Sequence, residues 1–92
     1  MIRSFNDTDT EALFSGRFSR RFHRMARVAQ RELQQLNAAR ELRDLAAFPS
    51  NQLEALTGAR RGQYSIRVND QYGICFGWHD GDANDVEVVD YH

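Results

Sequence analysis

The chain ends on the sequence EVVDYH, so that Asp90, Tyr91 and His92 occupy its last positions. Histidine titrates near neutral pH and serves as a general acid or base, and a carboxylate takes part in the same proton transfers. Tyrosine stacks on a nucleobase or donates a hydrogen bond. A second interpretation stays open here, because terminal residues usually fray and have no chemical role.

A second group of candidate residues lies in LEALTGARRGQYSIRV, residues 53–68, which we expect to be a loop that leads into a strand. Its charged side chains are Glu54, Arg60, Arg61 and Arg67. Because side chains alternate between the two faces of a strand, Ser65 and Arg67 are expected to project together and Ile66 to the opposite side. Arginine suits phosphate because its planar guanidinium makes paired hydrogen bonds.

Both groups together hold the side chains that cleavage of RNA by its own 2′-hydroxyl requires without a metal. The reaction needs a base for the 2′ proton, an acid for the leaving 5′ oxygen, and cations that hold the charge on phosphorus. The sequence predicts neither a metal nor another cofactor, because its histidines are scattered and Cys75 has no cysteine partner. It also lacks a phosphate-binding glycine loop and a strained nucleophile turn.

Positive charge is unevenly spread, although the net charge is only −1. All twelve basic residues are arginines within 1–67, whereas residues 68–92 carry six acids and no arginine. The run RFSRRFHRMARVAQR, residues 17–31, holds six arginines and no acid. Such a run favours phosphate binding, with an affinity that falls steeply as salt rises. The alternative is a solvent-exposed helix face in a protein that uses arginine in place of lysine.

The length of 92 residues fits one domain, 1–92, with a single modest core. No apolar run approaches the roughly 20 residues that cross a bilayer, and the N-terminal segment lacks a signal-peptide core. We therefore expect a cytoplasmic protein with no membrane partner. Cys75 lies in the apolar run ICF and is expected to be a buried thiol.

Helices are predicted to dominate the first half, after a short strand at MIRSF. Capping residues around Asp7 predict a brief helix at 8–15, which Gly16 ends. Apolar residues at helical spacing predict an amphipathic helix over 20–38. Its apolar face consists of Phe22, Met25, Ala26, Ala29, Leu33 and Leu36. A further helical piece is predicted at 39–48, before Pro49.

The second half alternates apolar and polar residues and predicts strands at 63–68, 72–78 and 86–92, joined by turns at 69–70 and 79–85. On the last strand, alternation separates Val86, Val88 and Asp90 from Glu87, Val89 and Tyr91. The predicted order is β-α-α-(α)-β-β-β. This is an α+β fold with helices packed on one face of a small antiparallel sheet.

The segments MIRSF, LEALTGARRGQYSIRVNDQY, ICF and VEVVDYH resemble the HigB-type killer toxins of the RelE/ParE superfamily. The resemblance covers nearly the whole chain, and GARRGQYSIRVNDQY and the terminal DYH are its most specific parts. It implies a RelE-like fold and a toxin that enters the ribosomal A site and cuts mRNA. It also implies a HigA-type helix-turn-helix antitoxin, which neutralises the toxin and alone contacts the operator DNA of their shared operon.

The resemblance also implies roles for individual residues. The terminal Asp90, Tyr91 and His92 correspond to active-site residues, with Asp90 and His92 as the proton-transfer groups. Two further residues are catalytic candidates: Arg60, which corresponds to the arginine of a G-x-R-x-G loop, and Glu54, which lies where a related branch carries a histidine. The candidate RNA-binding residues are Arg61, Arg67, Arg20, Arg24 and Arg27.

Two departures from the family pattern leave alternatives open. A carboxylate at Glu54 is a weak general base at neutral pH, and Thr57 replaces a lysine of the related branch. Gly73 stands where family members commonly have an arginine, so either the toxin is attenuated or Arg67 compensates. The alternative functions are a ParE-like protein that poisons DNA gyrase without a nuclease site, and a degenerate toxin that only binds its antitoxin.

Overall fold

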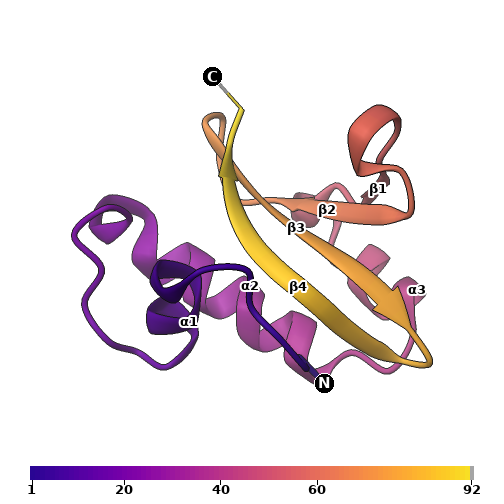
Figure 1. Cartoon of the computed structure of the whole chain (residues 1–92), viewed down its shortest axis with the longest axis horizontal. Helices are drawn as coiled ribbons and strands as arrows, with labels where there is room; N and C mark the ends of the chain where they lie inside the picture. The colour runs from indigo at the N-terminus through magenta and orange to yellow at the C-terminus, as the bar shows by residue number, and fades with distance from the viewer. Residues whose placement is uncertain (92) are drawn as a thin grey trace.

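A computed structural model describes residues 1–91 and shows three α-helices packed against a four-stranded antiparallel sheet (Figure 1). The helices are α1 Thr8–Phe14, α2 Ala26–Ala38 and α3 Leu42–Ala46. The strands β1 Glu54–Ala55, β2 Gln63–Arg67, β3 Tyr72–His79 and β4 Asp82–Asp90 lie side by side in chain order. The predicted α+β class is therefore confirmed.

Helix α2 buries most of the predicted apolar face, since Ala29, Leu33 and Leu36 are core residues, and Met25 just before the helix is also in the core. The helix begins at Ala26 rather than at residue 20, because a short 3₁₀ turn over His23–Met25 precedes it. Phe22 is buried as predicted but has a non-helical backbone, and its N–H donates to the Ser19 hydroxyl at 3.3 Å.

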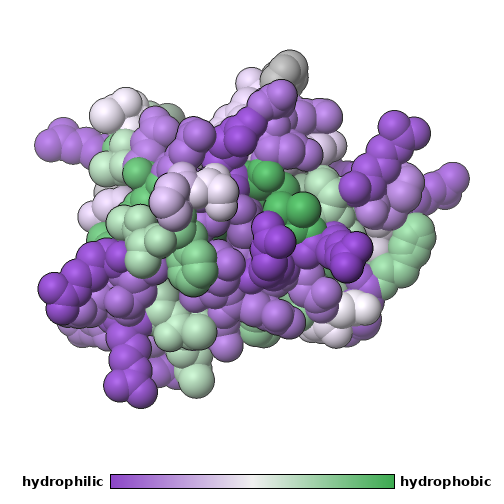
Figure 2. Space-filling view, turned by 180° about the vertical axis from the view of Figure 1, so that it is seen from behind, coloured by the Kyte–Doolittle hydropathy of each residue, from purple (hydrophilic) through white to green (hydrophobic). Residues whose placement is uncertain are grey.

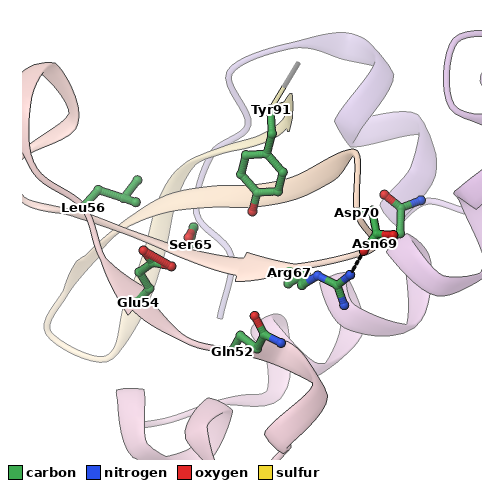
Figure 3. A pocket seen from close by; sticks show the side chains of 8 residues that line it. All are labelled: Gln52, Glu54, Leu56, Ser65, Arg67, Asn69, Asp70 and Tyr91. Atoms are coloured by element: carbon green, nitrogen blue, oxygen red, sulfur yellow. Dashed lines mark hydrogen bonds and ion pairs between the residues drawn. The ribbon is translucent and has the colours of Figure 1, made fainter.

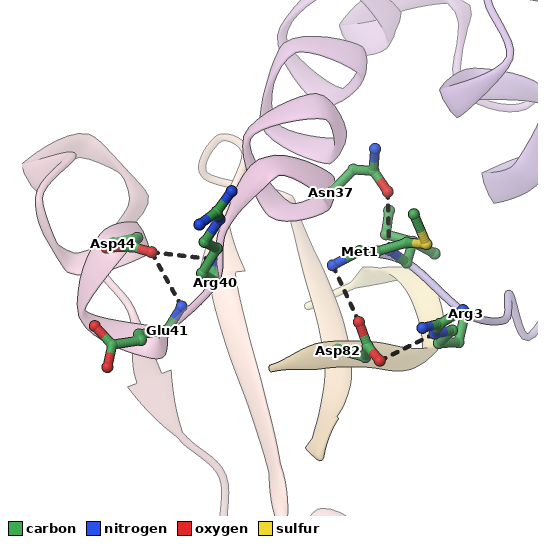
Figure 4. A network of polar contacts seen from close by, with 8 residues as sticks. Met1, Arg3, Asn37, Arg40, Glu41, Asp44 and Asp82 are labelled. Atoms are coloured by element: carbon green, nitrogen blue, oxygen red, sulfur yellow. Dashed lines mark hydrogen bonds and ion pairs between the residues drawn. The ribbon is translucent and has the colours of Figure 1, made fainter. Parts of the chain in front are cut away.

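Helix α3 is shorter than the predicted 39–48 because capping fixes its start. One carboxylate oxygen of Asp44 accepts the backbone N–H groups of Arg40 and Glu41 at 2.9 and 3.0 Å (Figure 4). Those two hydrogen bonds are the main reason that the pKa of Asp44 lies below its ordinary value. Ala39, just before, is extended rather than helical.

The predicted N-terminal strand does not form a ladder. Instead, Ile2 and Phe5 make isolated parallel bridges to Ala83 and Val86 of β4. Asp82 fastens this segment, because its carboxylate pairs with the amino group of Met1 at 3.3 Å and with Arg3 Nε at 2.9 Å (Figure 4). A five-residue segment with only two bridges falls short of a regular strand.

The β3–β4 turn is tighter than the predicted 79–85. It uses Asp80 and Gly81, whose φ angles of 49° and 82° suit a two-residue hairpin. The polar residues that follow therefore belong to β4, where Asp85 has φ 52° near a register shift of the ladder. Val86 and Val88 still face the core as predicted.

The two faces of the sheet differ. Toward the helices lie Ile66, Ile74, Phe76, Val86 and Val88, all in the core. We call the opposite side, which carries Ser65, Arg67, Cys75 and Glu87, the outer face. Within the described residues, no helix is long and apolar enough to cross a membrane. Seen from behind, apolar side chains form small patches between hydrophilic ones (Figure 2).

Candidate active site on the outer face of the sheet

The strand register brings charged residues from distant parts of the chain onto the outer face. Ser65 is the direct partner of Glu54 on β1 and of Cys75 on β3, and Cys75 pairs in turn with Glu87. Directly paired residues of antiparallel strands project to the same side. Glu54 and Glu87, 33 positions apart in the sequence, therefore lie in one row across the sheet.

The C-terminal tail is fixed at least as far as Tyr91. Asp90 still pairs with Tyr72 in the sheet, and its carboxylate accepts the Gln71 amide at 3.1 Å. The backbone N–H of Tyr91 donates to the Gln71 carbonyl at 2.8 Å. The Tyr91 ring then extends over the outer face toward Ser65 and Arg67 (Figure 3).

Tyr91 divides a trough on the outer face into two adjoining cavities. The first has a volume of about 300 Å³, and its lining residues are Gln52, Glu54, Leu56, Ser65, Arg67, Asn69, Asp70 and Tyr91 (Figure 3). The second has a volume of about 270 Å³, and its lining residues are Leu56, Arg60, Ser65, Cys75, Val89, Asp90 and Tyr91. Because Leu56, Ser65 and Tyr91 border both cavities, the trough is continuous around the tyrosine.

Each half of the trough contains one arginine that a carboxylate orients. Arg60 donates to Gln63 Oε1 at 3.0 Å and to Glu87 Oε1 at 3.2 Å. Arg67 forms an ion pair with Asp70. The side chains of Arg60 and Arg67 are 39% and 37% exposed, respectively. A guanidinium has five N–H donors, so both arginines keep donors for an anion in the trough.

Burial raises the pKa of two groups in the trough. The pKa of the Tyr91 phenol is raised, chiefly by burial and further by the negative charges of Cys75 and Glu54 when these are ionised. A tyrosine phenol is protonated at neutral pH even at its ordinary pKa of about 10, and the upward shift keeps it so, which leaves it able to donate a hydrogen bond. Burial likewise raises the pKa of the Cys75 thiol, which is 3% exposed, so the predicted buried thiol is confirmed.

A buried carboxylate that the sequence did not predict lies in α2. Glu32 is 3% exposed, and its Oε2 has no hydrogen-bond partner among the described residues. Burial raises the pKa of Glu32 to about 7, although the positive charges of Arg31 and Arg67 partly oppose this shift. Glu32 thus couples electrostatically to an arginine of the trough.

The structure gathers some of the predicted site residues and separates others. Those that line the trough are Glu54, Arg60, Arg67 and Tyr91, and Asp90 borders its second cavity, although strand alternation groups Asp90 with Val86 and Val88 on the other face of β4. Arg61 is exposed outside both cavities, and so are Arg20 and Arg27. Arg24 lines a third cavity, of about 340 Å³, next to the β2–β3 turn. His92 lies outside the described residues.

Several residues in or beside the trough were not among the predicted site residues, among them Ser65, Glu87 and Gln52. Ser65 and Glu87 were placed by strand alternation, but nothing in the sequence shows that they face each other across Cys75. Gln52 has a left-handed backbone with φ 46°, which only the structure reveals. The signal for Ser65 was its spacing of two from Arg67 in a predicted strand.

The chain is thus a small α+β protein with a trough on the outer face of its sheet, lined by arginine, carboxylate and tyrosine side chains. A family model described as the RelE-like toxin of the type II toxin–antitoxin system HigB matches residues 3–92, and the chain belongs to this family.

Two relatives share part of the sequence. Toxin HigB-1 of Vibrio cholerae is 47% identical over 53 residues, which cover 58% of this chain and 56% of the relative. An uncharacterized protein of Haemophilus influenzae is 35% identical over 60 residues, which cover 65% of this chain and 59% of the relative. The matched region thus spans somewhat more than half the length of each relative.

Proposed function

We propose that this toxin is a ribosome-dependent endoribonuclease that cuts mRNA in the ribosomal A site. The observation that carries the proposal is the position of Tyr91, a protonated donor between the Arg60 half and the Arg67 half of the trough. This arrangement suits a phosphodiester, because donors and cations fixed beforehand stabilise the charge that develops on phosphorus. The reaction needs no metal in this proposal.

The bond changes assign roles to the side chains. The 2′ oxygen of the RNA attacks phosphorus and the bond from phosphorus to the 5′ oxygen breaks, leaving a 2′,3′-cyclic phosphate and a 5′-hydroxyl. A base takes the 2′ proton and an acid returns a proton to the 5′ oxygen. In this proposal Asp90 and His92 exchange these protons, and Tyr91 donates to a phosphate oxygen.

The arginines bind phosphate, and Glu54 has a different task. Arg60 and Arg67 contact the scissile phosphate and its neighbour from opposite sides of Tyr91. Glu54 faces the Arg67 half of the trough (Figure 3), where a carboxylate can accept hydrogen bonds from the amino groups of a base. Surface arginines away from the trough, among them Arg20, Arg24, Arg27 and Arg61, contact ribosomal RNA.

Membership of a toxin–antitoxin family supports an antitoxin as the partner of this toxin. We expect a HigA-type helix-turn-helix antitoxin that binds and neutralises the toxin. The operator DNA of their operon is then contacted through the antitoxin. The ribosome supplies the remaining surface and positions the mRNA.

Mapping the cut ends of a defined mRNA in a reconstituted translation reaction tests the proposal. We expect cuts inside codons, with 5′-hydroxyl ends, that appear only when ribosomes are present. Cleavage of free RNA at the same rate would contradict ribosome dependence. Inhibition of gyrase supercoiling without any RNA cleavage would favour the ParE-like alternative.

A further inference from the structure

Gly73 is the second residue of β3, and its backbone conformation does not require a glycine. Its φ lies outside the left-handed region that favours glycine, unlike the φ of 82° at Gly81 in the β3–β4 turn. A glycine inside a strand weakens the strand and often marks the close approach of another group. The reason for glycine at this position must therefore be space rather than backbone conformation.

The group that approaches Gly73 is the Tyr91 phenol. A Cβ atom at residue 73 would lie 1.9 Å from Tyr91 Oη and 2.5 Å from Tyr91 Cζ, and 3.3 Å from the Ile66 carbonyl oxygen. Contacts of Cβ atoms below 3.0 Å essentially never occur in proteins. Any side chain at 73 therefore excludes the tyrosine from its observed place.

The surroundings of this place are those of the candidate site. Ser65, which is 4% exposed, is a hydrogen-bonding partner of the Tyr91 hydroxyl. Arg67 is the direct cross-strand partner of Gly73 and lines the same half of the trough as Tyr91. The Tyr91 hydroxyl therefore lies close enough to Arg67 for both side chains to contact the same phosphate.

We propose that Gly73 is a positioning residue whose missing side chain forms the seat for the Tyr91 phenol, which Ser65 holds beside Arg67. The seat itself follows from the geometry, and its importance for RNA cleavage rests on the proposed function. In this proposal Gly73 contributes to the activity of the site and does not attenuate the toxin. A side chain at 73 would move the hydroxyl away from the scissile phosphate.

The test follows the tyrosine directly, by NMR of protein labelled at tyrosine Cζ, with the Tyr91 signal assigned through Tyr91→Phe. In the wild type we expect the Tyr91 phenol to titrate above its ordinary range. In Gly73→Ala the signal should move, and its pKa should fall toward the ordinary tyrosine value. The control is Gly77→Ala on the same strand, where the new Cβ would meet Asn84 Oδ1 at 2.4 Å and leave Tyr91 unchanged.

Cleavage supplies the second readout. Because the Cβ atom in Gly73→Ala displaces the Tyr91 hydroxyl, the ribosome-dependent cleavage rate of this variant should fall by roughly 10²-fold. If Gly73 acts through Tyr91, adding Gly73→Ala to Tyr91→Ala should cause no further loss, because the ring that it displaces is absent. The double variant also removes the clash, so it remains informative if Gly73→Ala alone folds poorly.

Either of two results would overturn the proposal: an unchanged Tyr91 signal in Gly73→Ala, or an equal loss of cleavage from Gly73→Ala with and without the tyrosine ring. A wild-type protein that cuts no RNA would instead refute the proposed function. In that case the NMR comparison still decides whether Gly73 seats the tyrosine.

Discussion

Arg67 and Gly73 face each other directly across the β2–β3 ladder. Side chains of such a pair project to the same face of the sheet, so the guanidinium of Arg67 emerges beside the position that glycine leaves empty. From the sequence alone it was open whether Arg67 could replace a cation at residue 73. The register places Arg67 directly opposite residue 73 on the adjacent strand. This position supports the hypothesis that Arg67 replaces the missing arginine over the hypothesis that the toxin is attenuated.

A Gly73→Arg variant separates these two hypotheses. Under attenuation, the added cation should raise the cleavage rate. We expect the opposite, a loss of at least tenfold, because the new side chain must expel the Tyr91 phenol that lies 1.9 Å from its Cβ position. Single-turnover cleavage of ribosome-bound mRNA measures the effect, and a faster variant would contradict our account of Gly73.

Glu87 orients Arg60, so Glu87→Gln should affect turnover more than binding. The amide keeps the shape of the side chain but removes the charge that pairs with Arg60 Nη2 at 3.2 Å. We expect about a tenfold lower cleavage rate, equivalent to about 1.4 kcal/mol, with RNA affinity unchanged or tighter because a negative charge is lost. Glu41→Gln, which removes the exposed partner of Arg43, is the matched control. A weaker affinity at an unchanged rate would assign Glu87 a binding role instead.

Glu32 should make the folded protein less stable as pH rises. Because its pKa is raised from 4.5 to about 7 in the folded state, the folded protein holds a proton that the unfolded chain releases between those values. The stability present below about pH 4.5 is therefore lost progressively up to about pH 7, by an amount on the order of 3 kcal/mol.

A Glu32→Gln variant removes this dependence. Urea unfolding should show the variant to be more stable than the wild type at pH 8 and close to it at pH 5. Glu11→Gln, an exposed carboxylate on α1, controls for the loss of one negative charge. Equal stability of Glu32→Gln and wild type at pH 8 would show that ionisation of Glu32 does not lower the free energy of unfolding.

Thr10 links α1 to the strand that carries the tail. Its hydroxyl is fully buried, donates to Asp7 Oδ2 at 2.9 Å and accepts the backbone N–H of Val88 at 3.0 Å. Thr10→Val keeps the shape but leaves that buried N–H unpaired, which should lower the free energy of unfolding by about 1–3 kcal/mol. The exposed Thr8→Val on the same helix should have little effect. A loss in both variants alike would point to helix propensity as the cause.

Periodicity predicted the core well because burial is what generates it. The apolar spacing from Phe22 to Leu36 and the alternation of Val86 and Val88 both correspond to buried positions. Element boundaries were less predictable where local hydrogen bonds decide them, as at the Asp44 cap and the hydroxyl of Ser19. Asp82 and Asn84 have turn composition but lie in β4, since two residues are enough for the hairpin turn.

The candidate site was only partly predictable, because it depends on strand register. Tyr91, Arg60 and Arg67 could be named from residue types, but their common trough exists only once β1 to β4 are aligned. The proposed role of Gly73 could not be read from the sequence for a related reason. A missing side chain carries no signal of what fills its space until the neighbouring strands are in place.

The most direct test of the account is the rate of mRNA cleavage inside programmed ribosomes for the wild type, Arg67→Ala and Arg43→Ala. Arg43 is an exposed arginine that lines neither cavity of the trough and controls for the loss of one positive charge. We predict that Arg67→Ala loses about 10²–10³-fold in rate, as expected for removing one group that stabilises transition-state charge, while Arg43→Ala keeps the wild-type rate. Equal rates for all three proteins, or no cleavage by the wild type, would contradict the claim that the trough beside Arg67 is a nuclease site.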